Sequence, residues 1–174
     1  MAKTFQVDTG GTLTTGLQAY YKLEDATEFY VGGGTYDLTN DNAATFVAGK
    51  VNNAGNFVRA SSQRLRILNN MGIDGGTISF SFWVKMVSQP TGIDSNGFTM
   101  VMQGNNTSDI FNFFEYVDVG SGSMAIRATR LKQGLGVDPR LQVAQTFTNG
   151  TWYHVVMTYL GSSPYTMAAF VNGS

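Results

Sequence analysis

Short runs in which apolar and polar residues alternate recur along the chain, and stretches rich in Gly, Asn, Asp and Ser separate them. The clearest run is GTISFSFWVKM at residues 76–86. One set of alternate positions is apolar (Ile78, Phe80, Phe82, Val84, Met86), and the other holds Thr77, Ser79, Ser81, Trp83 and Lys85. Successive side chains of a β-strand point to opposite faces, so this run predicts a strand with one face in a core. Helical periodicity is almost missing, so the chain is predicted to be an all-β sandwich or barrel.

Other runs extend this prediction. In TWYHVVMTYL, residues 151–160, both alternate sets are bulky, as expected of a central strand contacted on both faces. RLQVAQTF at 140–147 and SMAIRATR at 123–130 alternate more simply and predict strands covered on one face. The remaining predicted strands are LQAYYKLE (17–24), TFVAG (45–49), NFVRA (56–60), RLRIL (64–68), FTMVMQG (98–104), FNFFEYV (111–117) and TMAAFV (166–171).

The letters FVNGS at residues 170–174 predict a β-hairpin turn. Asn-Gly after alternating apolar residues is a strong hairpin signal, because both central residues of a type I′ turn need positive φ. A hairpin needs a returning strand, and only Ser174 follows Gly173. We therefore expect the native chain to continue past Ser174; the alternative is that the arm KTFQVDT (3–9) of a neighbouring subunit supplies the strand.

Composition excludes several classes of partner. The chain has 174 residues, 43% of them hydrophobic and only 13% charged, with a formal net charge of -1. Such a chain can bury a core, but it carries no basic surface for nucleic acid, so no nucleic-acid partner is expected. Cys is absent, which removes disulfides and thiolate metal sites. No stretch is long and apolar enough for a membrane span, and the N-terminus has no apolar leader, so no membrane insertion is expected.

Five segments follow one another in an order that resembles laminin G-like domains of the concanavalin A-like lectin/glucanase superfamily. They are GLQAYYKLED (16–25), YDLTN (36–40), GKVNNAGNFVRASSQRLRI (49–67), GGTISFSFWVKM (75–86) and GTWYHVVMTYLGSSPYTMAAFVNG (150–173). The most specific part is Trp-x-His-Val followed by Thr-Tyr and a Val-Asn-Gly turn. The resemblance implies a two-sheet antiparallel jelly-roll sandwich over residues 16–174 that lacks its last strands, preceded by an arm at residues 1–15.

Catalytic carboxylates do not stand out. A retaining glucanase needs two carboxylates about 5 to 5.5 Å apart in one cleft. Glu24, Asp25 and Glu28 lie at a predicted strand end and its loop, and Glu115 and Asp118 fall on opposite faces of one strand. These residues are therefore interpreted as solvated carboxylates, and the chain is not expected to be an enzyme.

The aromatic and histidine side chains are also given structural roles. His154, the sole histidine, resembles a structural position of the family and is interpreted as a satisfied sandwich residue. Trp83 and Trp152 could stack on sugar rings, but the resemblance favours packing for both.

Two loops are candidate binding sites. QGNNTSD offers Asn105, Asn106 and Asp109 as ligand-binding residues, and GIDSNG offers Asp94 and Asn96. Carboxylate and amide oxygens suit Ca²⁺, so Asp94, Asn96 and Asp109 are weak calcium candidates. Neither spacing is diagnostic, and loops of this kind are more often simply turns.

The sequence thus predicts a non-catalytic recognition or adhesion module that binds a glycan or a surface protein. We expect it on a virus or phage particle, as a decoration or fibre protein, or on a cell surface, reached by lysis. The alternative is a purely structural virion assembly protein whose partners are neighbouring subunits of the particle. A glycoside hydrolase is the least favoured hypothesis, because it needs a carboxylate pair.

Overall fold

The computed structural model describes residues 16–27, 36–67, 77–87, 98–105, 108–120, 123–131, 140–144, 147–160 and 166–173. Between residues 98 and 144 it describes the backbone together with the side chains of Ala125 and Leu141. The chain forms two compact units, Met1–Gly72 and Ile73–Ser174. The arm expected at residues 1–15 falls outside the described residues and stays a prediction.

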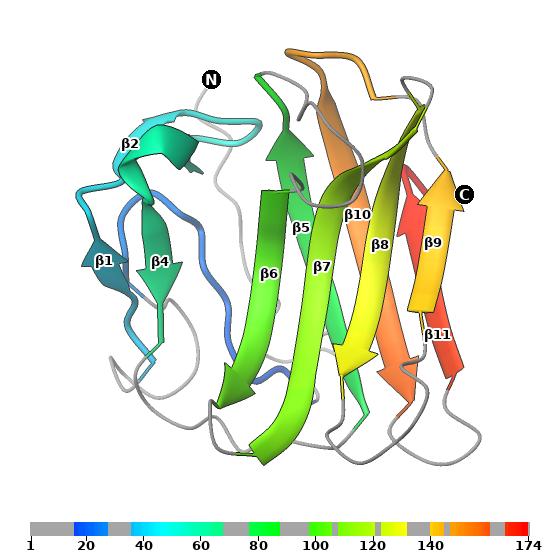
Figure 1. Ribbon diagram of the computed structural model, residues 1–174. Coiled ribbons are helices and arrows are strands. Elements are labelled where there is room, and N and C mark those ends of the chain that lie inside the picture. The colour runs from blue at the N-terminus through cyan, green and yellow to red at the C-terminus, as the bar shows by residue number, and fades with distance from the viewer. Residues whose placement is uncertain are drawn as a thin grey trace. The chain divides into compact units, whose positions relative to one another are not determined.

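Two antiparallel sheets build the second unit (Figure 1). One has the strand order β11-β10-β5, with β5 at Ile78–Lys85, β10 at Trp152–Leu160 and β11 at Thr166–Val171. The other has the order β6-β7-β8-β9, with β6 at Phe98–Asn105, β7 at Ser108–Gly120, β8 at Ser123–Leu131 and β9 at Arg140–Ala144. β10 is the central strand of its sheet, which confirms the prediction from its two bulky faces.

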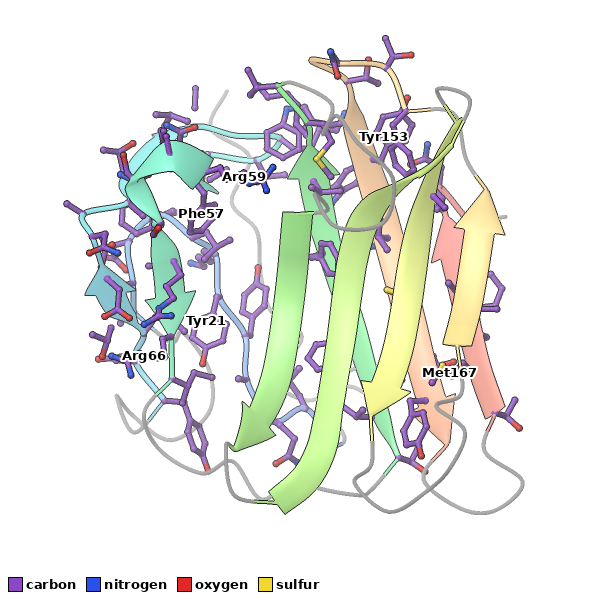
Figure 2. The ribbon with its side chains drawn as sticks, in the orientation of Figure 1. Tyr21, Phe57, Arg59, Arg66, Tyr153 and Met167 are labelled. Carbon is purple, nitrogen blue, oxygen red and sulfur yellow. The ribbon has the colours of Figure 1, made fainter. Side chains whose placement is uncertain are left out.

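The core of this unit lies on one face of β10. Val155 and Met157 are fully buried, and their registers pair them with Phe82 and Phe80 of β5. Leu141 of β9 packs against the same cluster, so the two sheets face each other as a sandwich. The inner face predicted for β5 is confirmed, because this core contains or contacts Phe80, Phe82, Val84 and Met86. Figure 2 labels Tyr153, near the start of β10, and Met167 of β11, which packs against the core.

Two local features close the ends of the strands. Asn172 and Gly173 have φ of 53° and 86°, so the predicted positive-φ turn is confirmed. The Asn172 backbone N–H donates to the His154 carbonyl at 2.8 Å, and the Asn172 Oδ1 accepts from the His154 N–H at 2.9 Å. At the other end, the Gly150 N–H donates to the Met86 carbonyl at 2.7 Å, joining the segment before β10 to the end of β5.

The first unit contains two short antiparallel pairs. β1 (Thr39–Asp41) pairs with β4 (Arg64–Arg66), and β2 (Thr45–Ala48) pairs with β3 (Asn53–Asn56). A 3-10 turn at Arg59–Ser61, the only helical turn in the described ranges, connects β3 to β4. The structure is thus all-β, as predicted, and no helix within those ranges reaches the length and hydrophobicity needed to span a bilayer.

Two strand predictions in the first unit are wrong. Residues 17–24 form no β-ladder: Leu23 has φ of 57°, which breaks the extended chain, and the segment is tied instead by the Tyr21 hydroxyl donating to the Tyr36 carbonyl at 2.7 Å. The strand expected at 56–60 ends at Asn56. The Val58 N–H is taken by the Gln63 side-chain oxygen at 2.7 Å, so this N–H is not available for a ladder.

Candidate functional site

The outward surface of the β11-β10-β5 sheet carries an unusual set of side chains. We call it the aromatic face and define it as the residues alternating with the core positions: Ser79, Ser81, Trp83 and Lys85 of β5, Trp152, His154, Val156 and Thr158 of β10, and Ala168 and Phe170 of β11. These strands position the set by register, since cross-strand partners share a face: Trp83 pairs with His154, Lys85 with Trp152, and Phe170 with Val156.

Trp83 is the most prominent member of the aromatic face. Its side chain is 46% exposed although it is one of the largest apolar groups in the chain. The His154 ring lies beside it, with ring centroids 5.1 Å apart and an interplanar angle of 36°. Phe170, on the far side of β10, is 43% exposed. The packing expected for Trp83 is found on the outer face of the sheet, against the His154 ring, where the Trp83 side chain also stays accessible.

Polar groups are fixed among these rings. The Ser81 Oγ and the His154 Nε2 lie 2.9 Å apart, and the His154 backbone is held by Asn172 at the hairpin turn. His154 is half-buried. These contacts agree with the structural role expected for His154, whose side chain lies on the outer face of the sheet and not in the core.

Lys85 and Trp152 form the end of the same row. The Lys85 Nζ lies 5.0 Å from the centroid of the Trp152 ring, within range of a cation–π interaction. Both side chains are half-buried. The Lys85 ammonium group is therefore held against the aromatic face by the Trp152 ring.

The Ser81–His154 pair invites comparison with a catalytic arrangement. Ser81 and His154 resemble the first two members of a nucleophilic triad, but a triad also needs a carboxylate that orients the histidine. Among the described residues, the His154 ring has a hydrogen bond to Ser81 and none to a carboxylate. Elsewhere, Glu24 accepts from the Asn52 side chain at 2.6 Å, and Asp25 accepts from the Thr27 N–H at 2.7 Å, so these carboxylates stabilise turns.

The loop candidates are only partly described. Asn105 ends β6 and pairs with Ser108, the first residue of β7. Asp109 lies within β7 and not in a loop as expected. Asn106, Asp94 and Asn96 lie outside the described residues, as do the side chains of Asn105 and Asp109. The calcium and loop-binding hypotheses therefore stay predictions.

Alternation contained the signal for the aromatic face. It placed Trp83 opposite Phe82 and Val84, on the half-wet side of β5. What the sequence did not indicate is which side chains meet Trp83 there, because His154 is 71 residues away along the chain and reaches it only through the β5–β10 register.

The second unit is thus an antiparallel β-sandwich with an exposed aromatic surface and polar groups fixed among its rings. The chain belongs to the concanavalin A-like lectin/glucanases superfamily: the model of a laminin G family within it matches residues 52–174. Laminin G-like domains are generally non-catalytic modules that bind carbohydrates or proteins, and their fold is the predicted jelly roll. No curated protein and no solved structure matched the chain.

Proposed function

We propose that the chain is a non-catalytic glycan-binding module whose ligand lies on the aromatic face. The observation that carries the proposal is the exposure of Trp83 beside His154 and Ser81. A sugar ring has an apolar C–H face that stacks on aromatic rings and hydroxyl groups that need hydrogen-bond partners. The aromatic face offers both, from rigid strands whose register fixes the spacing.

Exposure of Trp83 also needs a reason. Burying a large apolar side chain contributes roughly 1.5–3 kcal/mol, and Trp83 gains only part of this in the isolated chain. A ligand that covers the ring would recover the rest. Scattered exposed apolar residues are common on proteins, but here Trp83, Trp152 and Phe170 share one sheet face.

The test is a glycan array followed by calorimetry on the full chain. Trp83→Ala should reduce affinity for any glycan bound by at least about tenfold, while the melting curve changes little. Phe57→Ala is the matched control: Phe57 is about as exposed as Trp83 but lies in the first unit. Equal losses in both variants, or no glycan bound by the wild type, would overturn the proposal.

The loop residues are the rival location for the same function. A triple variant with Ala at Asn105, Asn106 and Asp109 separates the two sites. If the ligand or Ca²⁺ binds the loops, this variant loses binding and Trp83→Ala keeps it. The reverse pattern favours the aromatic face.

We further propose that the module is displayed on a virus or phage particle or on a cell surface, where its binding face can reach an external glycan. Mass spectrometry of purified particles from the natural source should find the chain. A particle that assembles normally without the chain, yet attaches poorly, supports recognition. Failed assembly would instead support the structural virion role.

A further inference from the structure

We infer that Asn172 is a site of spontaneous deamidation, in which the Gly173 nitrogen attacks the Asn172 side chain, and that the isoaspartate product releases His154 from the hairpin turn. Both turn residues are exposed and have positive φ, 53° and 86°. Asparagine followed by glycine favours this reaction, because glycine has no Cβ to hinder a close approach of its backbone. The inference concerns the turn and does not depend on the ligand of the aromatic face.

The reaction needs only water in addition to the chain. The Gly173 nitrogen forms a bond to the Asn172 Cγ, the Cγ–Nδ2 bond breaks, and Nδ2 leaves as ammonia with the proton that the Gly173 nitrogen loses. Water then opens the resulting cyclic imide at one of its carbonyl carbons. Opening at the side-chain carbonyl gives aspartate, and opening at the backbone carbonyl gives isoaspartate, in which the main chain runs through the former side chain. The net change is hydrolysis of an amide to a carboxylic acid and ammonia, with no oxidation or reduction.

Hydrogen bonds at the turn hold the group that is attacked and leave the attacking group accessible. The Asn172 Oδ1 accepts from the His154 backbone N–H at 2.9 Å, and this donor would stabilise the negative charge that develops on Oδ1 when Cγ is attacked. Among the described residues, neither the Gly173 N–H nor the Asn172 Nδ2 has a hydrogen-bond partner. The attacking nitrogen and the leaving nitrogen are therefore both available to react.

A second Asn-Gly pair provides a matched comparison. Asn149 and Gly150 are also exposed, and Gly150 has φ of 78°, but its N–H donates to the Met86 carbonyl at 2.7 Å. This nitrogen must leave its partner before it can lose its proton, just as hydrogen-bonded amides exchange only after local opening. Within the described ranges the Asn149 side chain accepts no hydrogen bond, so no donor polarises its carbonyl. Asn149 should therefore react more slowly than Asn172.

Rigidity is the competing effect. The hydrogen bond from His154 also restrains the Asn172 side chain, and a restraint that keeps Cγ away from the Gly173 nitrogen would protect the turn. In that case Asn149, whose side chain is not held, reacts first. The order in which the two asparagines react therefore decides between activation and protection.

The two products differ in their effect on His154. The Asn172 N–H donates to the His154 carbonyl at 2.8 Å while its Oδ1 accepts the His154 N–H, so one residue holds both backbone groups of the other. Aspartate keeps this backbone and offers a carboxylate oxygen as the acceptor. Isoaspartate adds a carbon to the main chain, so the two bonds no longer form together. Because the His154 and Trp83 ring centroids are 5.1 Å apart, release of His154 loosens the aromatic face at Trp83.

The test incubates the full chain at mildly alkaline pH and maps its peptides by mass spectrometry, with an isoaspartate methyltransferase to label isoaspartate. Deamidation at Asn172 should be at least about fivefold faster than at Asn149, the factor expected for one net hydrogen bond. In denaturant the two rates should converge, since both local structures are lost. The third Asn-Gly pair, at residues 96–97, lies outside the described residues, and its peptide is followed separately.

Hydrogen exchange at the His154 amide checks the consequence. Aged chain rich in isoaspartate should exchange there at least about fivefold faster than fresh chain, because the hydrogen bond is lost. Asn172→Asp, the matched control for the aspartate product, should exchange like fresh chain. Reaction at Asn149 that is as fast or faster, or a preference for Asn172 that persists in denaturant, overturns the site assignment. Unchanged exchange in the isoaspartate form overturns its effect on the turn. Neither measurement uses a ligand, so failure of the proposed glycan binding leaves this inference standing.

Discussion

The two units of the chain are held together by different interactions. In the second unit, Val155 and Met157 are fully buried between the sheets, and long strands pair around them. In the first, strands are three or four residues long, and Val47, Val51, Phe57 and Val58 remain about half exposed. Its contacts are largely polar, such as Asn42 Nδ2 donating to the Ser62 carbonyl at 2.9 Å. Apolar burial fixes one unit, and specific hydrogen bonds fix the other.

The largest difference in stability is expected when one phenylalanine is replaced by alanine in each unit. Phe147 is 1% exposed and meets the Tyr153 ring edge-on at a centroid distance of 4.6 Å. Phe147→Ala should lower the free energy of unfolding by about 3–5 kcal/mol. Phe57→Ala should cost less than about 1 kcal/mol, because Phe57 is half exposed and its ring lies over Gly55.

Denaturant melts followed by far-UV circular dichroism measure both variants. Tryptophan fluorescence adds a probe of the second unit alone, because Trp83 and Trp152, the two tryptophans of the chain, both lie there. Similar losses in the two variants would show that the first unit has an apolar core as important as that of the second.

Polar contacts should dominate the first unit. The Asn40 side chain bridges a loop: its Nδ2 donates to the Ala44 carbonyl at 2.7 Å and its Oδ1 accepts the Ala44 N–H at 2.8 Å. Ala44 is buried, so Asn40→Ala would leave two buried backbone groups without these partners. We expect a loss of about 1–3 kcal/mol, with faster hydrogen exchange at the Ala44 amide.

Asn53→Ala is the matched control for Asn40→Ala, because Asn53 is exposed and its side chain has no hydrogen bond in the described part of the chain. Its effect should stay within about 0.5 kcal/mol. If Asn40→Ala is as mild as this control, the polar account of the first unit fails.

The contrast between the units explains how far the sequence could be interpreted. β5 was predicted with its inner and outer faces, because burial on one side forces its eight residues to alternate, and β10 was predicted as a central strand. The Asn172-Gly173 turn was predicted because its chemistry is local. β1 was not predicted, since it has three residues and its partner β4 lies far along the chain, with Asp41 opposite Arg64, 23 residues away. Local alternation carries no information on such partners.

The candidate site follows the same rule. Alternation placed Trp83 on the outer side of its strand, but its neighbours there come from β10 through long-range register. The loop residues chosen for their chemistry lie mainly outside the described residues, so the sequence remains the basis for them. Residue chemistry thus indicated which side chains can bind, and the register between strands determines which of them share a surface.

Left-handed turn residues should give smaller changes in stability, and a substitution to glycine in one unit and from glycine in the other should change it in opposite directions. Ala43 in the first unit has φ of 54°, which an alanine adopts at a cost, so Ala43→Gly should stabilise the chain by about 0.5 kcal/mol after the greater entropy of an unfolded glycine is subtracted. Gly173 in the second has φ of 86°, and nothing lies within 4 Å of a Cβ built there. Gly173→Ala should therefore destabilise by about 1 kcal/mol through backbone strain alone. Chemical denaturation of both variants checks the signs, and stabilisation by Gly173→Ala would contradict the assigned turn.

The smallest effect concerns the charges that join β1 to β4. The Asp41 Oδ2 lies 2.8 Å from the Arg64 Nε and 3.0 Å from the Arg66 Nε, and the hydrogen bond from Arg64, followed by that from Arg66, holds the pKa of Asp41 below its ordinary value. A carboxyl whose pKa is lower in the folded chain contributes stability that is present above the unfolded pKa, about 3.9, and is lost as pH falls through the folded pKa.

The pair is exposed, so stability should change only slightly, and NMR titration of the carboxyl is the sensitive measurement. Arg64→Gln should raise the pKa of Asp41 toward its ordinary value. Asp25 serves as an internal control, because the pKa of Asp25 is lowered by its hydrogen bond to the Thr27 N–H and should not move in that variant. If the pKa of Asp41 is unchanged when Arg64 is replaced, the β1–β4 pair does not depend on this charge contact.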